Sequence, residues 1–157
     1  MKSALKMALC SVALIAASTT TMADESTLGA VKARQSLMQL YSFNLGGLGA
    51  MVKGKADYDA AAASAYANNL LAVVNLDQSA MWPQGSDDEA LPGKSRALKK
   101  IWTTYPAVNE KHKALVAGAE KMAAAAGNGL DAVKANMGAV GGGCKGCHDT
   151  YRKPKDK

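Results

Sequence analysis

The segment GGGCKGCHDTY at residues 141–151 is the feature that most constrains this chain. The chain has only three cysteines and two histidines, and Cys144, Cys147 and His148 fall within five consecutive residues. Residues three and four apart lie on one face of a helix, so both thiols and the imidazole would face the same side. A disulfide at this spacing would be strained and would close almost no loop, so it would stabilise little. The segment therefore predicts that something other than a disulfide engages these side chains.

The order Cys-x-x-Cys-His is typical of covalent attachment of a c-type haem. We predict one haem c with its iron, bound through thioethers to Cys144 and Cys147, with His148 as the proximal axial ligand. The preceding glycines are interpreted as clearance for the flat ring. A zinc site would need a fourth ligand, for which only His112 is left, and His112 is expected to be a polar residue at the surface or rim. A thioredoxin-like site would need a preceding strand, and two buried structural thiols are the remaining alternative.

The rest of the chain is typical of a helical protein. Alanine, leucine, lysine and methionine are frequent, and there are only four prolines. Apolar and small residues recur at helical spacing in four segments that end near residues 52, 80, 126 and 151. Only the connection after the second segment is long, and it carries prolines, glycines and an acidic run. This layout predicts an all-α antiparallel four-helix bundle in a single domain, residues 24–157.

Several local details follow from the same pattern. Asp57 is expected to cap the second helix, and Leu76 is expected in its core. Gly46, Gly47 and Gly49 indicate close packing of the first helix against a neighbour or a flat ligand, or else a helix that frays or bends. The inward stripe of the first helix is expected to contain Leu28, Val31, Gln35, Met38, Ser42, Leu45, Gly49 and Val52.

Residues 1–23 have the pattern of a secretory signal peptide. Lys2 and Lys6 precede an apolar run, and small residues stand before the end of the segment at Ala23. We predict cleavage after Ala23 and export to the periplasm. The apolar run is too short for stable membrane insertion, although a retained N-terminal anchor is the alternative.

The formal net charge of the full chain is +6, and much of the basic excess lies in the C-terminal tail from Arg152 to Lys157. An exported protein rarely meets nucleic acid, so no nucleic-acid partner is expected. The tail is interpreted as a solvated helix end or as a docking patch for an acidic redox partner protein.

The chain resembles the class II c-type cytochromes, which are the cytochromes c′ and their low-spin relatives of the c-556 kind. The resemblance implies a four-helix bundle around the haem, often paired into a homodimer through the first two helices. It also implies that Arg34 and Gln35 lie near the haem propionates, where an arginine would make charge-assisted hydrogen bonds. It covers essentially the whole mature chain and is carried by AVKARQ at 30–35, VKG at 52–54 with Tyr58 and Asp59, the loop before Trp102, and CKGCHDTYRK at 144–153.

Met38 decides between two functions. It lies four residues after Arg34, where the resemblance places the distal residue. A thioether bound to iron would make a six-coordinate carrier of single electrons, which is our main prediction. Methionine is also a common core filler, so the alternative is a five-coordinate cytochrome c′ that binds NO or CO at an open site. No catalytic residues are expected, because Arg34 alone does not supply the acid–base group that a peroxidase needs.

Overall fold

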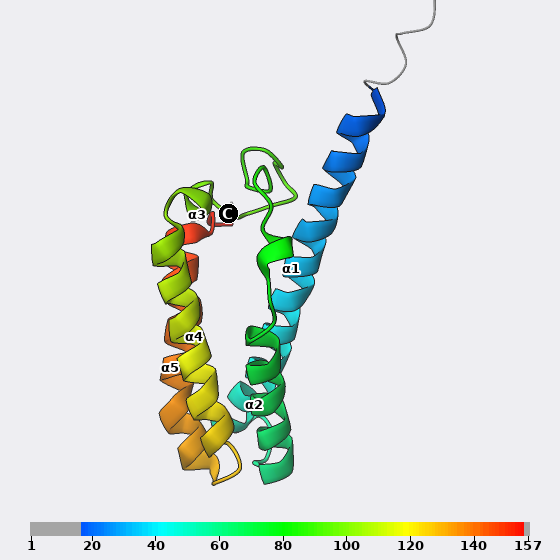
Figure 1. The fold of residues 1–157 in the computed structure, drawn as a ribbon. Coiled ribbons are helices and arrows are strands. Elements are labelled where there is room, and N and C mark those ends of the chain that lie inside the picture. Colours follow the sequence, from blue (N-terminus) through cyan, green and yellow to red (C-terminus); the bar gives the residue numbers. More distant parts are fainter. Residues whose placement is uncertain (1–16, 156–157) are drawn as a thin grey trace, which may run out of the picture.

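The computed structural model describes residues 17–155 as an all-α protein with four long helices (Figure 1). Successive long helices run in opposite directions, which confirms the predicted antiparallel bundle. Residues 1–16 of the expected signal segment lie outside the described residues. No helix in the described part is long and apolar enough to cross a membrane. The elements are α1 (Ala17–Val52), α2 (Ala60–Val74), the 3-10 turn η1 (Ser79–Met81), α3 (Lys100–Thr103), α4 (Tyr105–Ala125) and α5 (Leu130–Tyr151).

The helices pack in two pairs, α1 with α2 and α4 with α5, and glycines set the closeness of both contacts. A Cβ atom at Gly143 of α5 would lie 2.7 Å from Cα of Leu115 in α4. A Cβ atom at Gly47 of α1 would lie 2.5 Å from the ring of Tyr66 in α2. The prediction of close packing is thus confirmed for Gly47. Gly143 was interpreted from the sequence as clearance for the haem, but in the structure it allows α5 to pack closely against α4.

The core of the bundle is built from aliphatic residues of all four long helices. Leu48, Leu70, Met122, Val133 and Val140 are fully buried. The side of α1 that packs against this core is one position away from the predicted stripe, because Gln35 and Ser42 are exposed. Within residues 25–52 of α1, the buried residues are Val31, Arg34, Leu37, Tyr41, Asn44, Leu48 and Met51.

The ends of α2 differ from the prediction. Its N-cap is Asp59, whose carboxylate accepts a 2.7 Å hydrogen bond from the Ala62 N–H, so the assignment to Asp57 was wrong. The helix ends at Val74, where the backbone N–H and the side-chain amide of Asn75 both donate to Leu71 O. The chain therefore leaves the bundle earlier than predicted, and Leu76 is 49% exposed instead of belonging to the core.

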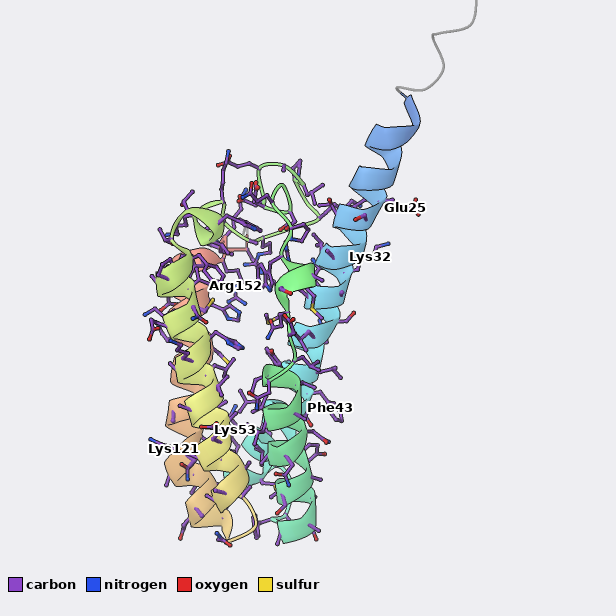
Figure 2. The ribbon with its side chains drawn as sticks, in the orientation of Figure 1. Glu25, Lys32, Phe43, Lys53, Lys121 and Arg152 are labelled. Carbon is purple, nitrogen blue, oxygen red and sulfur yellow. The ribbon has the colours of Figure 1, made fainter. Side chains whose placement is uncertain are left out.

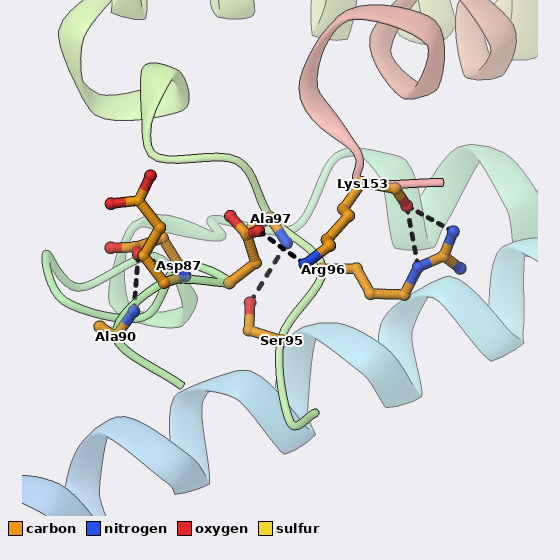
Figure 3. Close-up of polar contacts among 8 residues, drawn as sticks. Asp87, Ala90, Ser95, Arg96, Ala97 and Lys153 are labelled. Atoms are coloured by element: carbon orange, nitrogen blue, oxygen red, sulfur yellow. Dashed lines mark hydrogen bonds and ion pairs between the residues drawn. The ribbon is translucent and has the colours of Figure 1, made fainter. Parts of the chain in front are cut away.

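The connection between η1 and α3, which we call the strap (residues 82–99), crosses from the α1–α2 pair to the α4–α5 pair (Figure 1). Its last part is joined to the chain that follows α5 (Figure 3). Ala97 and Arg152 form an isolated antiparallel bridge. The Lys153 N–H donates to Arg96 O over 2.8 Å, and Nε of Arg96 donates back to Lys153 O over 2.9 Å. The strap is thereby fixed to the C-terminal end of α5, directly after the predicted haem-binding motif.

Candidate haem-binding site

Helix α5 carries all three residues of the predicted attachment motif on the side that faces the interior. Cys144, Cys147 and His148 are half-buried and line one cavity. Both cysteines are free thiols. Lys145 and Asp149 are exposed and form an ion pair with each other. The geometry expected from the spacing of the motif therefore holds: two thiols and an imidazole open onto the same space.

This cavity has a volume of about 980 Å³ and lies between the two helix pairs, where side chains point inward in Figure 2. The volume is at the upper end of the range for small-molecule and cofactor sites, about 300–1,000 Å³. Its wall is mainly apolar, and all four long helices and the strap contribute to it. Apolar lining residues include Met38, Leu45, Leu70, Ile101, Leu115 and Val140.

The titratable groups of the motif are held in their neutral forms. Burial raises the pKa of the Cys144 and Cys147 thiols. Burial lowers the pKa of His148, and the positive charges of Arg152 and Arg96 lower it further against the opposing effect of Asp149. A neutral imidazole offers the lone pair that binds a metal ion. The site therefore presents a metal-binding nitrogen beside two protonated thiols.

Met38 reaches the cavity from α1. It is half-buried and packs against the hydrophobic core cluster. Tyr41 lies one turn further along α1 and also lines the cavity. Burial raises the pKa of Tyr41 to about 12, so its hydroxyl stays neutral.

The hydroxyl of Tyr41 is part of a polar chain that the sequence did not reveal. It accepts a 2.9 Å hydrogen bond from the Gln78 side chain and donates to Val73 O over 3.3 Å. His112 from α4 adjoins this chain, with Nε2 at 3.0 Å from Val74 O and 3.4 Å from the Gln78 amide nitrogen. His112 is half-buried in the cavity wall. This contact joins α4 to the end of α2. It could not be predicted from the sequence, where the lysines on either side of His112 are typical of an exposed segment.

Arg34 lines the same cavity and is 5% exposed. Its guanidinium donates over 2.7 Å to the hydroxyl of Ser86 and over 2.7 Å to that of Ser95, and it also donates to Ser86 O. It lies 4.6 Å from the ring centroid of Trp82. Burial lowers the pKa of Arg34, and the charge of Asp87 partly opposes that effect. Arg34 therefore anchors the strap to α1.

Gln35 stands beside Arg34 at the edge of the cavity. Its side chain is exposed and donates a 2.8 Å hydrogen bond to Lys94 O in the strap. The two residues that the resemblance placed near the propionates thus lie together at one side of the cavity and bind the strap.

The residues of this site fit a covalently bound haem. The donor set consists of two free thiols and one neutral imidazole on one helix face, and the large apolar cavity lies directly beside them. Within residues 17–155, no three histidine, cysteine, aspartate or glutamate side chains gather into a group that could hold a metal ion by itself.

Known proteins match most of the chain. The sequence pattern of the family described as Cytochrome C' matches residues 29–152. The chain belongs to the cytochrome c′ family. Members of this family are haem proteins and not enzymes, and the family implies a covalently bound haem c.

Two relatives illustrate the range of this cytochrome c′ family. The cytochrome c′ of Cereibacter sphaeroides is 35% identical over 122 residues, which cover 78% of this chain and 81% of that protein. The cytochrome c-556 of Agrobacterium tumefaciens is 32% identical over 130 residues, which cover 81% of this chain and 99% of that protein. The chain is thus similar both to proteins called cytochrome c′ and to one of the c-556 kind.

Solved cytochrome c′ structures share the fold. The protein from Rhodobacter sphaeroides superposes with a TM-score of 0.79 at 33% identity and covers 82% of this chain and 98% of that one. A ferrous variant from Alcaligenes xylosoxidans with bound NO gives a TM-score of 0.72 at 34% identity, with coverage of 83% and 98%. A third cytochrome c′, with ligand-controlled dimer dissociation, gives 0.75 at 28% identity, with coverage of 82% and 98%.

Proposed function

We propose that this chain is an exported mono-haem cytochrome c′ that binds small gases such as NO or CO. The main observation in support of this proposal is that two free thiols and a neutral imidazole on α5 open onto a cavity of about 980 Å³. Cys144 and Cys147 would hold the haem through thioethers, and His148 would be its proximal ligand. When bound, the haem would supply an iron that changes oxidation state by one electron and binds diatomic gases when ferrous.

On the distal side, Met38 would cover the site without ligating the iron. Its packing against the core cluster supports this role, since methionine commonly fills irregular space in cores. The solved relative with bound NO adds support for gas binding. Arg34 and Gln35 would stand at the propionate edge, where Arg34 would keep the strap closed over the haem.

One-electron transfer with Met38 as sixth ligand is the second candidate. It was our main prediction from the sequence, and the relative of the c-556 kind favours it. The two functions make opposite demands on Met38, because a bound thioether closes the position that a gas would take.

The optical spectrum of a Met38→Ala variant distinguishes these functions. If Met38 only covers the site, the wild-type protein should be high-spin, and the variant should remain high-spin. The variant should also bind CO about tenfold more tightly, because the side chain no longer occupies the distal space. Leu45→Ala, which changes another lining residue, should affect CO affinity less. A low-spin wild type whose thioether signature disappears in Met38→Ala would contradict gas binding and support electron transfer.

We further infer that residues 1–23 direct export to the periplasm and are removed after Ala23. The support is the order of basic, apolar and small residues in that segment. The intact mass of the purified holoprotein reports this cleavage, and retention of residues 1–23 would contradict it.

A homodimer through α1 and α2 is also proposed. Phe43 is 66% exposed and Leu40 is 47% exposed on α1. Phe43 stacks edge-on with Tyr66 of α2, with ring centroids 5.9 Å apart, so the apolar surface continues from one helix to the other. Contiguous exposed apolar patches often mark protein interfaces.

Phe43→Glu should convert the dimer to a monomer at micromolar concentration, because the dimer would have to bury the new charge. Sedimentation velocity measures this change. Lys121→Glu is the control, because Lys121 is exposed on α4, on the side of the bundle away from Phe43 (Figure 2). A wild-type protein that is already monomeric at high concentration would refute the proposed interface.

A further inference from the structure

We propose that the motif-bearing end of the bundle is a docking surface for an acidic protein that delivers electrons to the haem. Its basic rim is defined by Arg96, Lys100, Lys111, Arg152, Lys153 and Lys155. This inference rests on the proposed function in one respect, because a partner must reduce the haem iron. Gas binding to ferrous iron and one-electron transfer both require that reduction.

The rim is assembled from three segments that are far apart in the sequence. The bridge between Ala97 and Arg152 brings the end of the strap beside the tail after α5. The ammonium group of Lys100 lies 5.7 Å from the ring centroid of Tyr151, the last residue of α5. Lys111 of α4 reaches α5 as well, because a Cβ atom at Gly146 would lie 3.9 Å from its Nζ. The basic surface is therefore broader than the tail that the sequence suggested.

Nearby carboxylates neutralise little of this charge. Asp87 is buried and accepts hydrogen bonds from the N–H groups of Glu89 and Ala90 (Figure 3). Asp88 pairs with Lys153 of the rim at 3.6 Å, while Glu89 pairs with Lys99 outside it. Among the described residues, the other five rim cations have no carboxylate within ion-pair distance.

The rim also surrounds the place where an electron would enter. Arg96, Lys111 and Arg152 line the same cavity as Cys147 and His148. The propionates of a bound haem could offset two of these charges at most, so the rim would stay positive. Clustered charge of one sign steers an oppositely charged partner and raises its association rate. A partner with an acidic face would therefore be oriented with its redox group toward the motif.

Charge reversal at two exposed rim positions tests this surface. Lys100→Glu with Lys155→Glu should weaken binding of a labelled oligoglutamate peptide about tenfold in fluorescence anisotropy at about 20 mM salt. Lys53→Glu with Lys121→Glu changes the net charge equally at positions remote from Arg152 (Figure 2) and should change binding less than about twofold. About 200 mM salt should abolish most of the difference between the two variants.

Electron transfer supplies the second readout. Oxidation of the ferrous protein by the anion hexacyanoferrate(III), which is reduced to hexacyanoferrate(II), should slow in the rim variant and hardly change in the control. Oxidation by the cation hexaammineruthenium(III), which is reduced to its ruthenium(II) form, should be faster with the rim variant. Equal effects of both variants would show that only net charge matters and would overturn the docking surface. Binding to anionic phosphatidylglycerol vesicles but not to oligoglutamate would also overturn it, in favour of a lipid surface. A haem that exchanges electrons with neither reagent would refute the reduction step and the proposal with it.

Discussion

Replacing Cys144 and Cys147 together by serine should give a chain that has no covalently attached haem and does not maintain the native bundle. The cavity of about 980 Å³ is lined mainly by apolar side chains from both helix pairs. Without a fixed occupant, these side chains lose their packing partners and are exposed to water, which costs about 25 cal/mol per Å² of apolar surface. A wall to which all four long helices contribute therefore matters for a stability that is typically only about 5–15 kcal/mol. Haem staining after denaturing electrophoresis and thermal unfolding by circular dichroism measure the two losses.

Lys145→Ser is the matched control for the cysteine variant, because Lys145 lies between the two cysteines on the exposed side of α5. It removes only a surface ion pair with Asp149, and such pairs contribute about 0–1 kcal/mol. The control should keep its haem and nearly its full melting temperature. A cysteine double variant that melts like the wild type would show that the helices pack adequately around an empty or reversibly filled cavity, and would contradict this prediction.

The sequence predicted the bundle and the shared face of the motif residues well, because both depend on local spacing. Four helical segments with only one long connection leave few arrangements other than a bundle. On α5, Val133, Val140 and Tyr151 are buried and share one side with helical spacing. Cys144 and Cys147 continue that side and open onto the cavity. On α5, the spacing of the apolar residues and the chemistry of the motif therefore indicate the same face of the helix.

Periodicity failed on α1 because this helix has two inward sides. Leu37, Leu48 and Met51 pack against protein, whereas Met38 and Leu45 line the cavity. A hydrophobic pattern does not distinguish a wall that contacts protein from one that faces a ligand space, so the predicted stripe combined both.

The contacts that hold the strap to α1 could not be predicted, for a different reason. Arg34 binds Ser86 and Ser95, which follow it by 52 and 61 residues. Neither serine belongs to a periodic segment or a motif, so nothing in the sequence linked them to α1. The glycine contacts between α4 and α5 are of the same kind, because the closeness of two helices depends on both partners.

Arg34→Leu should destabilise the protein by about 1.5–3 kcal/mol, the usual contribution of hydrogen bonds to a charged group. The carbonyl of Ser86 and the hydroxyls of Ser86 and Ser95 are buried partners of this guanidinium. Leucine would remove these charge-assisted hydrogen bonds, although the Ser95 hydroxyl would still donate to Ser86 O and accept from the Ala97 N–H. The melting temperature of the holoprotein should fall by about 5–10 °C. The melting temperature of Arg34→Lys should lie between those of the wild type and Arg34→Leu. The ammonium group keeps the charge but lacks the planar guanidinium that reaches both serines.

The same variant should open the strap locally before the bundle unfolds, because Arg34 holds the strap to α1 through side-chain contacts alone. The strap contains Lys94, Arg96 and Lys99 as trypsin sites, so its cleavage at native temperature reports local opening. Arg34→Leu should accelerate cleavage within the strap more than cleavage elsewhere. Lys32→Leu, two residues earlier on the exposed side of α1, should leave both the melting temperature and the cleavage pattern nearly unchanged. If Arg34→Leu lowered the melting temperature without preferential cleavage in the strap, Arg34 would stabilise the bundle as a whole, and its assignment as the anchor of the strap would be wrong.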